Sequence, residues 1–255
     1  RYQGCFWRNS SLRFWALAEW CRTVGAAKFF HAELDNALFS LSGLGQSLDR
    51  LGVGLFVPRD APDRALASLM YCNRPASFVE LVGLYQKPGG IEHDMHALGV
   101  YSDRFPQWFH ALPTESYREY AWDVLSPKKT GGVFDAAAIG QYLFGAAPDY
   151  REKRIPKTGY VNENSKVDWS AIRFRLTAGV LQIQCGENDP WYVVYNVHLH
   201  AKNWKTFFRF VSDPAQVAGI NAGERVPALD LAEYLKGYVD WRMRRIKRSV
   251  LSRLG

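Results

Sequence analysis

The sequence predicts an α/β fold, because helix-like and strand-like segments alternate along a chain long enough to bury a substantial core. Residues 9–24 carry apolar side chains at helical spacing and end at Gly25, and an apolar strand begins at Phe29. This helix-then-strand order is one half of a parallel α/β unit. Further helices are expected over 37–51 and 77–85, with a strand between them over 53–58.

The remaining segments extend the same alternation. Residues 65–71 fit either a strand or a short helix, and a helix is expected to open within 91–98. Two strands are expected over 174–184 and 191–200. The sequence therefore predicts one α/β domain over residues 1–225, followed by a C-terminal basic amphipathic helix over 226–255.

The positive charge of the chain is concentrated at its C-terminal end. Residues 236–255 hold seven basic side chains and one acid, so this segment contributes +6 to the formal net charge of +7. A nucleic-acid-binding protein more often spreads such charge over its body, so nucleic acid is not expected as a partner. A basic amphipathic helix with Tyr238 and Trp241 favours docking on an anionic membrane surface or a partner domain. The alternative is a terminal helix packed on the body with a solvated basic face.

The cysteine pattern and the absence of apolar runs bear on location. The four cysteines are widely spaced and form no CxxC pair, which is typical of free thiols in a reducing compartment. No apolar run approaches the roughly 20 residues that a bilayer span needs. Charged side chains interrupt the N-terminal segment where a signal peptide would be apolar. These observations predict a cytoplasmic protein, with peripheral attachment to the inner membrane face as an option through 236–255.

Two acids stand directly after the strand that begins at Phe29. Glu33 and Asp35 are two apart, so along a strand their side chains share a face. Converging carboxylates are costly unless a cation lies between them, and Mg²⁺ or Mn²⁺ with a phosphate partner is the obvious candidate. The alternative is a polar turn with solvated acids.

A second candidate region follows the glycine-rich turn at 88–90. Asp94 suits a general base acting on a hydroxyl, or else a first-turn acid that complements a helix dipole. His93 and His96 would share a helical face, but two histidines make only half of a zinc site.

The middle of the chain offers candidates for sugar contacts. The aromatic-rich segment 103–127, with Trp108 and Phe109, suits either the wall of a sugar site or a core. Asp135 either caps the following helix or contacts a ligand hydroxyl. The small residues Ala136, Ala137 and Gly140 permit close approach of another backbone or of a ligand. The charged loop over 149–161 is a candidate lid over an anionic ligand.

The last predicted strand ends in a polar cluster. His198 and His200 share a face at its end, and Lys202 and Asn203 follow. This combination suits a metal ligand with phosphate contacts. The alternative is a pair of strand histidines whose hydrogen bonds are satisfied within the fold.

Taken together, Glu33-Leu34-Asp35, the segment from Phe134 to Tyr142 and the late His-x-His-x-Lys run resemble bacterial, metal-dependent GT-A-type glycosyltransferases that build surface polysaccharides. The resemblance spans residues 29–205 and implies a GT-A-like mixed sheet flanked by helices. It implies Mn²⁺ or Mg²⁺ as cofactor, a nucleotide-sugar donor, and a saccharide acceptor for which a lipid-linked form is one option. The implied site residues are the metal ligands Glu33, Asp35, His198 and His200, the catalytic base Asp94, the donor contacts Asp135, Gln141, Lys202 and Asn203, and the acceptor contacts Trp108 and Phe109.

One departure from that family concerns the N-terminal region. GT-A enzymes place a full nucleotide-binding βαβ region before the acid motif, whereas 28 residues precede Phe29. Part of that region is therefore expected to be missing from the chain, or the fold is only a relative. Two alternatives remain: a metal-dependent hydrolase or phosphoesterase that also uses His93 and His96, and a non-catalytic carbohydrate-binding domain.

Overall fold

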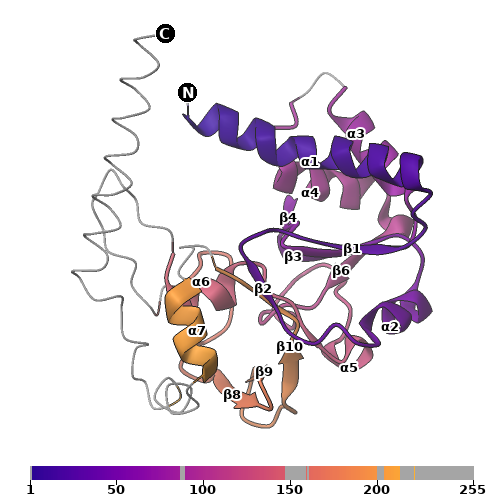
Figure 1. The fold of residues 1–255 in the computed structure, drawn as a ribbon. Coiled ribbons are helices and arrows are strands. Elements are labelled where there is room, and N and C mark those ends of the chain that lie inside the picture. The colour runs from indigo at the N-terminus through magenta and orange to yellow at the C-terminus, as the bar shows by residue number, and fades with distance from the viewer. Residues whose placement is uncertain are drawn as a thin grey trace, which may run out of the picture.

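The structure, a computed structural model, describes residues 2–86, 90–146, 159, 161–199, 204–212 and 221 (Figure 1). It is of mixed α/β class, with sheets of mixed strand direction flanked by helices, which confirms the predicted class. The helices are α1 (Tyr2–Val24), α2 (Leu44–Leu51), α3 (Ala76–Leu84), α4 (Asp94–Arg104), α5 (Pro127–Thr130), α6 (Ala138–Phe144) and α7 (Trp204–Ser212), with a 3-10 turn η1 at Pro106–Trp108.

The largest sheet has the strand order β1-β5-β3-β4, and β6 pairs with β3. Its strands are β1 (Phe29–Ala32), β3 (Leu55–Ala61), β4 (Arg64–Ala65), β5 (Leu69–Cys72) and β6 (Phe109–Leu112). The predicted parallel pairing next to β1 is wrong, because β5 is antiparallel to both β1 and β3. The chain turns back through β4 after β3 and inserts β5 between two strands of the same direction. Among the described strands of this sheet, β3 and β6 are the pair that runs in parallel.

Alternation along β3 separates two hydrophobic cores. Leu55 and Val57 point to the face that α1, α3 and α4 cover, whereas Phe56 points to the face that α2 covers (Figure 1). The first core also contains Phe14 of α1, and the second contains Leu48 of α2, both fully buried. Burial on both faces explains why β5 and the first four residues of β3, from Leu55 to Pro58, are apolar.

A smaller sheet and a two-stranded ribbon form the rest of the fold. The sheet has the order β7-β10-β9-β8, and the ribbon pairs β11 with β2. Their strands are β2 (Asn36–Leu38), β7 (Gly132–Val133), β8 (Arg173–Thr177), β9 (Val180–Gln184), β10 (Tyr192–Val194) and β11 (Asn196–His198). A third core joins this sheet to α6 and α7, with Phe174, Leu181 and Phe210 buried in it.

Three predicted elements differ from the observed ones. The helix expected over 37–51 is β2 followed by α2, because residues 36–38 pair with β11 and Gly43 takes a left-handed conformation (φ 73°) before α2. The strand expected over 174–184 is the hairpin of β8 and β9. Its turn places both Ala178 and Gly179 at positive φ, which a strand interior does not allow. The strand expected over 191–200 is divided into β10 and β11.

Other predictions agree with the structure or fall on residues it does not describe. Residues 9–24 lie in α1, residues 77–84 lie in α3, and the ambiguous segment 65–71 contributes to β4 and β5. The predicted helix over 226–255 and most of the predicted lid over 149–161 lie outside the described residues. Among the helices that are described, none combines the length and the apolar character that crossing a membrane requires.

The burial of α2 against the main sheet gives a stability prediction. Leu48→Ala is expected to lower the free energy of unfolding by about 2–5 kcal/mol, because Leu48 is fully buried and the lost side chain leaves a cavity. Urea unfolding monitored by circular dichroism measures the change. Gln46→Ala, on the exposed side of the same helix, is the control and should change stability by no more than about 0.5 kcal/mol. Equal effects of the two substitutions would contradict this placement of α2.

Candidate metal centre and adjoining cavity

The candidate site lies where the end of β1 meets the β2–β11 ribbon. Glu33 directly follows β1, and Asp35 lies in the turn that leads into β2. Within the ribbon Asn36 pairs with His198, and the Asp35 carbonyl oxygen accepts a hydrogen bond from the Leu199 N–H at 2.7 Å. Strand pairing therefore brings a late histidine beside two acids from the first part of the chain.

Glu33, Asp35 and His198 form a compact cluster. The His198 Nε2 atom lies 3.3 Å from Asp35 Oδ1 and 3.6 Å from Glu33 Oε2, and one ligand atom from each residue lies within 4.8 Å of the others. Burial by itself would lower the pKa of His198, but the hydrogen bond to Asp35 and the nearby carboxylates, Asp135 included, outweigh it and raise the pKa. The cluster thus favours a positive charge, carried by a proton on His198 or by a cation.

The donor set fits a divalent ion. Carboxylate oxygens suit Mg²⁺ and Mn²⁺, and imidazole is a common ligand for transition metals, so two carboxylates with one histidine favour Mn²⁺ over Mg²⁺. The side chains of Glu33 and Asp35 are 21% and 26% exposed, so a cation can reach them from the surface. Three protein ligands leave further coordination positions for a second partner.

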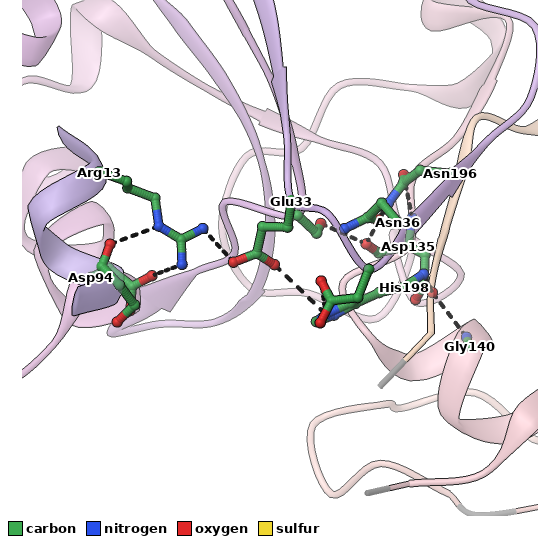
Figure 2. Close-up of polar contacts among 11 residues, drawn as sticks. Arg13, Glu33, Asn36, Asp94, Asp135, Gly140, Asn196 and His198 are labelled. Carbon is green, nitrogen blue, oxygen red and sulfur yellow. Dashed lines mark hydrogen bonds and ion pairs between the residues drawn. The ribbon is translucent and has the colours of Figure 1, made fainter. Parts of the chain in front are cut away.

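Asp135 supports the backbone of the cluster, and its buried side chain does not reach the cavity. Its side chain is fully buried, and its carboxylate accepts hydrogen bonds from the backbone N–H groups of Ile139 (2.9 Å), Gly140 (2.8 Å) and His198 (2.8 Å) (Figure 2). Burial raises its pKa to about 6 despite these bonds. The prediction that Asp135 contacts the donor is therefore corrected: the residue holds the start of α6 against β11 and fixes the position of His198.

A pair of buried asparagines completes this support. Asn196 is fully buried and donates to Asn36 Oδ1 at 2.7 Å and to the Asp135 carbonyl oxygen at 3.2 Å. Its own side-chain oxygen accepts the Asp135 N–H at 3.1 Å. Asn196 was not predicted as a site residue. The available signal was a polar residue within an apolar predicted strand, two residues before His198.

Gly140 allows the close packing of α6 on β11. A Cβ atom at this position would lie 2.0 Å from the His198 carbonyl oxygen and 2.9 Å from Asp135 Oδ2. Contacts this short do not occur, so any side chain would displace α6 or β11. The expectation that Gly140 permits close backbone approach is thereby confirmed.

Arg13 of α1 connects the cluster to a second carboxylate. Its guanidinium is ion-paired with Glu33 Oε1, and its Nη2 atom lies 3.2 Å from Asp94 Oδ2 (Figure 2). The Nε atom donates to the Ser10 carbonyl oxygen at 2.6 Å, which fixes the plane of the guanidinium. Arg13 was missed in the sequence analysis as a site residue, because a single arginine on a helix is an ordinary feature.

Asp94 is the first residue of α4 and is buried, with 4% of its surface exposed. Besides Arg13 it accepts a hydrogen bond from the Ser10 hydroxyl at 3.2 Å. Burial raises the pKa of Asp94, and the Arg13 charge opposes this increase without cancelling it. A raised pKa makes this carboxylate a better proton acceptor than an exposed aspartate, and the arginine holds it in place.

The two groups open into one cavity of about 300 Å³. Its wall combines site residues predicted from the sequence with residues that were not predicted. The lining residues are Ser10, Arg13, Glu33, Arg64, Leu66, Ala67, Asp94, Met95, Ala137, Gln141, Asn162, Glu163 and His198. Of the predicted residues, the structure thus brings together Glu33, Asp94, Gln141 and His198, with Asp35 beside His198.

The predicted acceptor contacts lie elsewhere. Phe109 is buried within β6 in the core beneath α1, α3 and α4, and Trp108 packs under the Arg74 guanidinium with 4.4 Å between the charge and the ring centroid. Neither residue lines this cavity. Burial in a core, the more common role of aromatic side chains, applies to Phe109, whereas Trp108 is half-buried against Arg74.

The remaining predicted ligands are placed as follows. His93 caps α4, because its Nδ1 atom accepts the His96 N–H at 3.1 Å. Across the described part of the chain, no cluster of potential metal ligands includes either histidine. His200, Lys202 and Asn203 lie outside the described residues.

Comparison of the chain with protein-family models, with curated proteins and with solved structures found no match in any of the three.

A buried carboxyl group lies near Asp135 and was not predicted. Glu115 is 2% exposed and accepts a hydrogen bond from the Ser116 hydroxyl at 3.0 Å. Burial, reinforced by the negative charge of Asp135, raises its pKa to about 7. Glu115 thus retains a proton in the folded chain at pH values where an exposed glutamate has lost it.

The close contact at Gly140 gives a binding prediction. Gly140→Ala is expected to weaken Mn²⁺ binding about tenfold or more, because the added methyl group displaces the backbone that carries His198. Isothermal titration calorimetry measures the affinity. Gly83→Ala in α3 is the control: no atom lies within 4 Å of its Cβ position, so Mn²⁺ affinity should stay constant while stability rises by up to about 1 kcal/mol. Unchanged Mn²⁺ affinity in both variants would argue against His198 as a ligand.

The raised pKa of Glu115 predicts a loss of stability with increasing pH. Between the ordinary glutamate pKa of 4.5 and the folded value of about 7, the folded chain binds a proton that the unfolded chain does not. The free energy of unfolding should therefore fall by up to about 3 kcal/mol from pH 5 to pH 8 through this group. Glu115→Gln should reduce that pH dependence, as measured by urea unfolding at both pH values. A variant with the same pH dependence as wild type would contradict the assignment.

Proposed function

We propose that the chain is a metal-dependent glycosyltransferase that moves a sugar from a nucleotide-sugar donor to a saccharide acceptor. The observation that carries this proposal is the shared cavity, which Glu33 and His198 of the metal cluster line together with Asp94. A transfer reaction needs both features at once, a site for a diphosphate and a base for a hydroxyl. The resemblance of the short motifs to GT-A-type enzymes points in the same direction.

Each protein group has a distinct role in this proposal. Glu33, Asp35 and His198 would hold the divalent ion. When bound there, the ion supplies positive charge that offsets the diphosphate leaving group. Asp94 accepts the proton of the acceptor hydroxyl while the oxygen of that hydroxyl forms a bond to the anomeric carbon. The bond between the anomeric carbon and the diphosphate oxygen breaks in the same step. Arg13 is a positioning residue, because it holds Asp94 and Glu33 through one guanidinium.

The burial of Asp94 supports its role as the base. Both of its carboxylate oxygens are held, one by Arg13 and the other by Ser10, so the group keeps a fixed orientation at the cavity wall. Its raised pKa makes it a stronger base than an exposed aspartate.

A hydrolase with two metal ions is less well supported. Such an enzyme needs a second set of ligands about 4 Å from the first ion. Within the residues that the structure describes, Glu33, Asp35 and His198 are the one cluster of potential ligands that meets the distance criterion. The His93 imidazole, which that alternative requires, is engaged in capping α4.

Metal-dependent nucleotide binding tests the proposal. We expect one of UDP, GDP, CDP and CMP to raise the melting temperature in the presence of Mn²⁺, because a ligand at 100 times its dissociation constant stabilises a fold by about 2.7 kcal/mol. Differential scanning fluorimetry with and without Mn²⁺ measures the shift. Asp35→Asn should abolish it, since the substitution removes a ligand charge at constant shape. Glu119→Gln, an exposed acid away from the cavity, is the control and should keep the shift.

Asp94→Asn separates binding from catalysis in the same protein. The variant should retain the Mn²⁺-dependent nucleotide shift but lower the transfer rate by about 10²–10⁴-fold, because the amide cannot accept the proton. Absence of any nucleotide shift in folded wild-type protein would refute the transferase proposal. If Asp94→Asn keeps both the nucleotide-induced shift in melting temperature and full transfer activity, Asp94 is not the base.

A further inference from the structure

Two neutral amide side chains line the cavity together with its charged residues. Gln141 and Asn162, here called the amide pair, are 7% and 8% exposed, and both line the cavity. The Gln141 Oε1 atom accepts a hydrogen bond from Asn162 Nδ2 at 2.9 Å, and Asn162 Oδ1 accepts the Asn164 N–H at 2.9 Å. These bonds use the acceptor oxygens. Within the described residues, the Gln141 amide nitrogen has no partner, so its N–H groups are available to a ligand.

Available amide donors beside carboxylates suit a ligand with several hydroxyl groups. A hydroxyl both donates and accepts, so it can bond an amide N–H and a carboxylate oxygen at the same time. The amide pair offers donors, and Asp94 and Glu33 offer acceptors on the same cavity wall. Buried polar groups without such partners carry a desolvation cost, which a polyhydroxylated ligand would relieve.

The two cationic side chains at the cavity are already engaged. Arg13 is ion-paired with Glu33 and Asp94. Arg64 makes a bidentate pair with the buried carboxylate of Asp60, at 3.0 and 2.6 Å. Among the described residues, the cavity therefore presents no guanidinium or ammonium group without a carboxylate partner. An anionic ligand group would have to compete with one of these pairs.

Four further residues form an apolar part of the cavity wall. Leu66, Ala137 and Met95 pack together as one cluster, and Ala67 follows Leu66 in the chain. Apolar surface in the same cavity as polar donors and acceptors fits the two kinds of surface of a sugar ring. The volume of about 300 Å³ lies at the lower end of the range for ligand pockets, which suits one ring.

We propose that this cavity binds a single uncharged sugar ring, with the amide pair as the specificity-determining contact that bonds its hydroxyl groups, and that it discriminates against sugars that carry a carboxylate. The inference deepens the proposed transferase, on which its role in transfer rests, by naming the class of sugar. It rests on the amide pair, the engaged arginines and the apolar wall, and not on the metal cluster.

Saturation-transfer NMR with methyl glycosides tests this specificity directly. The probes are the methyl glycosides of glucose, galactose and mannose, each compared with its uronate, which replaces the C6 hydroxymethyl group by a carboxylate. We expect at least one neutral glycoside to bind, with an affinity at least about tenfold higher than that of its uronate. Gln141→Leu nearly conserves side-chain volume and should lower the affinity for the neutral glycoside about tenfold. Gln46→Leu, at an exposed position of α2, should leave that affinity unchanged. Gln141→Lys adds a cation without a carboxylate partner and should reduce the difference in affinity between the neutral glycoside and its uronate.

Three outcomes would overturn the proposal: uronates that bind as well as the neutral glycosides, an unchanged affinity in Gln141→Leu, or no binding of any neutral glycoside to the wild-type chain. The assay contains no divalent ion and no nucleotide, so it is independent of the transferase test. Neutral-glycoside binding without a Mn²⁺-dependent nucleotide shift would keep the sugar site and refute the transferase. A Mn²⁺-dependent nucleotide shift together with a preference for uronates would support the transferase and refute the neutral-sugar site.

Discussion

The site depends on one buried carboxylate, that of Asp135. An ionised carboxylate out of contact with water is costly unless hydrogen bonds replace its hydration, and three backbone N–H groups do so here. Two of them belong to α6 and one to β11, so the same charge joins a helix to a strand that carries His198. The main chain of Asp135 is in turn held by Asn196, which also bonds Asn36 on the neighbouring strand. The orientation of the histidine is thus set by groups that never touch a ligand.

A row of alternating charge extends from this support to α4. Asp94, Arg13, Glu33 and His198 follow one another, and each contact joins groups of opposite sign when His198 is protonated (Figure 2). Glu33 uses one oxygen for Arg13 and directs the other toward His198. Helix α1 therefore contributes a wall of the site as well as the hydrophobic cover of the main sheet. This arrangement explains how several acids lie close together at moderate cost.

The sequence was most informative where local pattern determines structure. Apolar spacing located α1, α3 and β3. The resemblance to GT-A-type enzymes grouped Glu33, Asp35 and His198 as candidate ligands, and these three side chains lie together in the structure. Pairing between distant segments could not be read in the same way. The 37–51 segment is helical by pattern, yet its first residues are taken by β11, and the hairpin of β8 and β9 depends on a left-handed alanine. Composition also does not determine whether aromatic residues such as Trp108 and Phe109 are buried or exposed.

The β2–β11 ribbon has a consequence for the order of folding. It joins residues 36–38 to residues 196–198, so most of the chain must be collapsed before this pairing is favourable. Contacts between such distant segments carry a high loop-closure entropy and form late in folding. The three ligands converge only when this last connection is made. A cation that requires all three therefore has no binding site on a half-folded chain, and its occupancy reports completion of the fold.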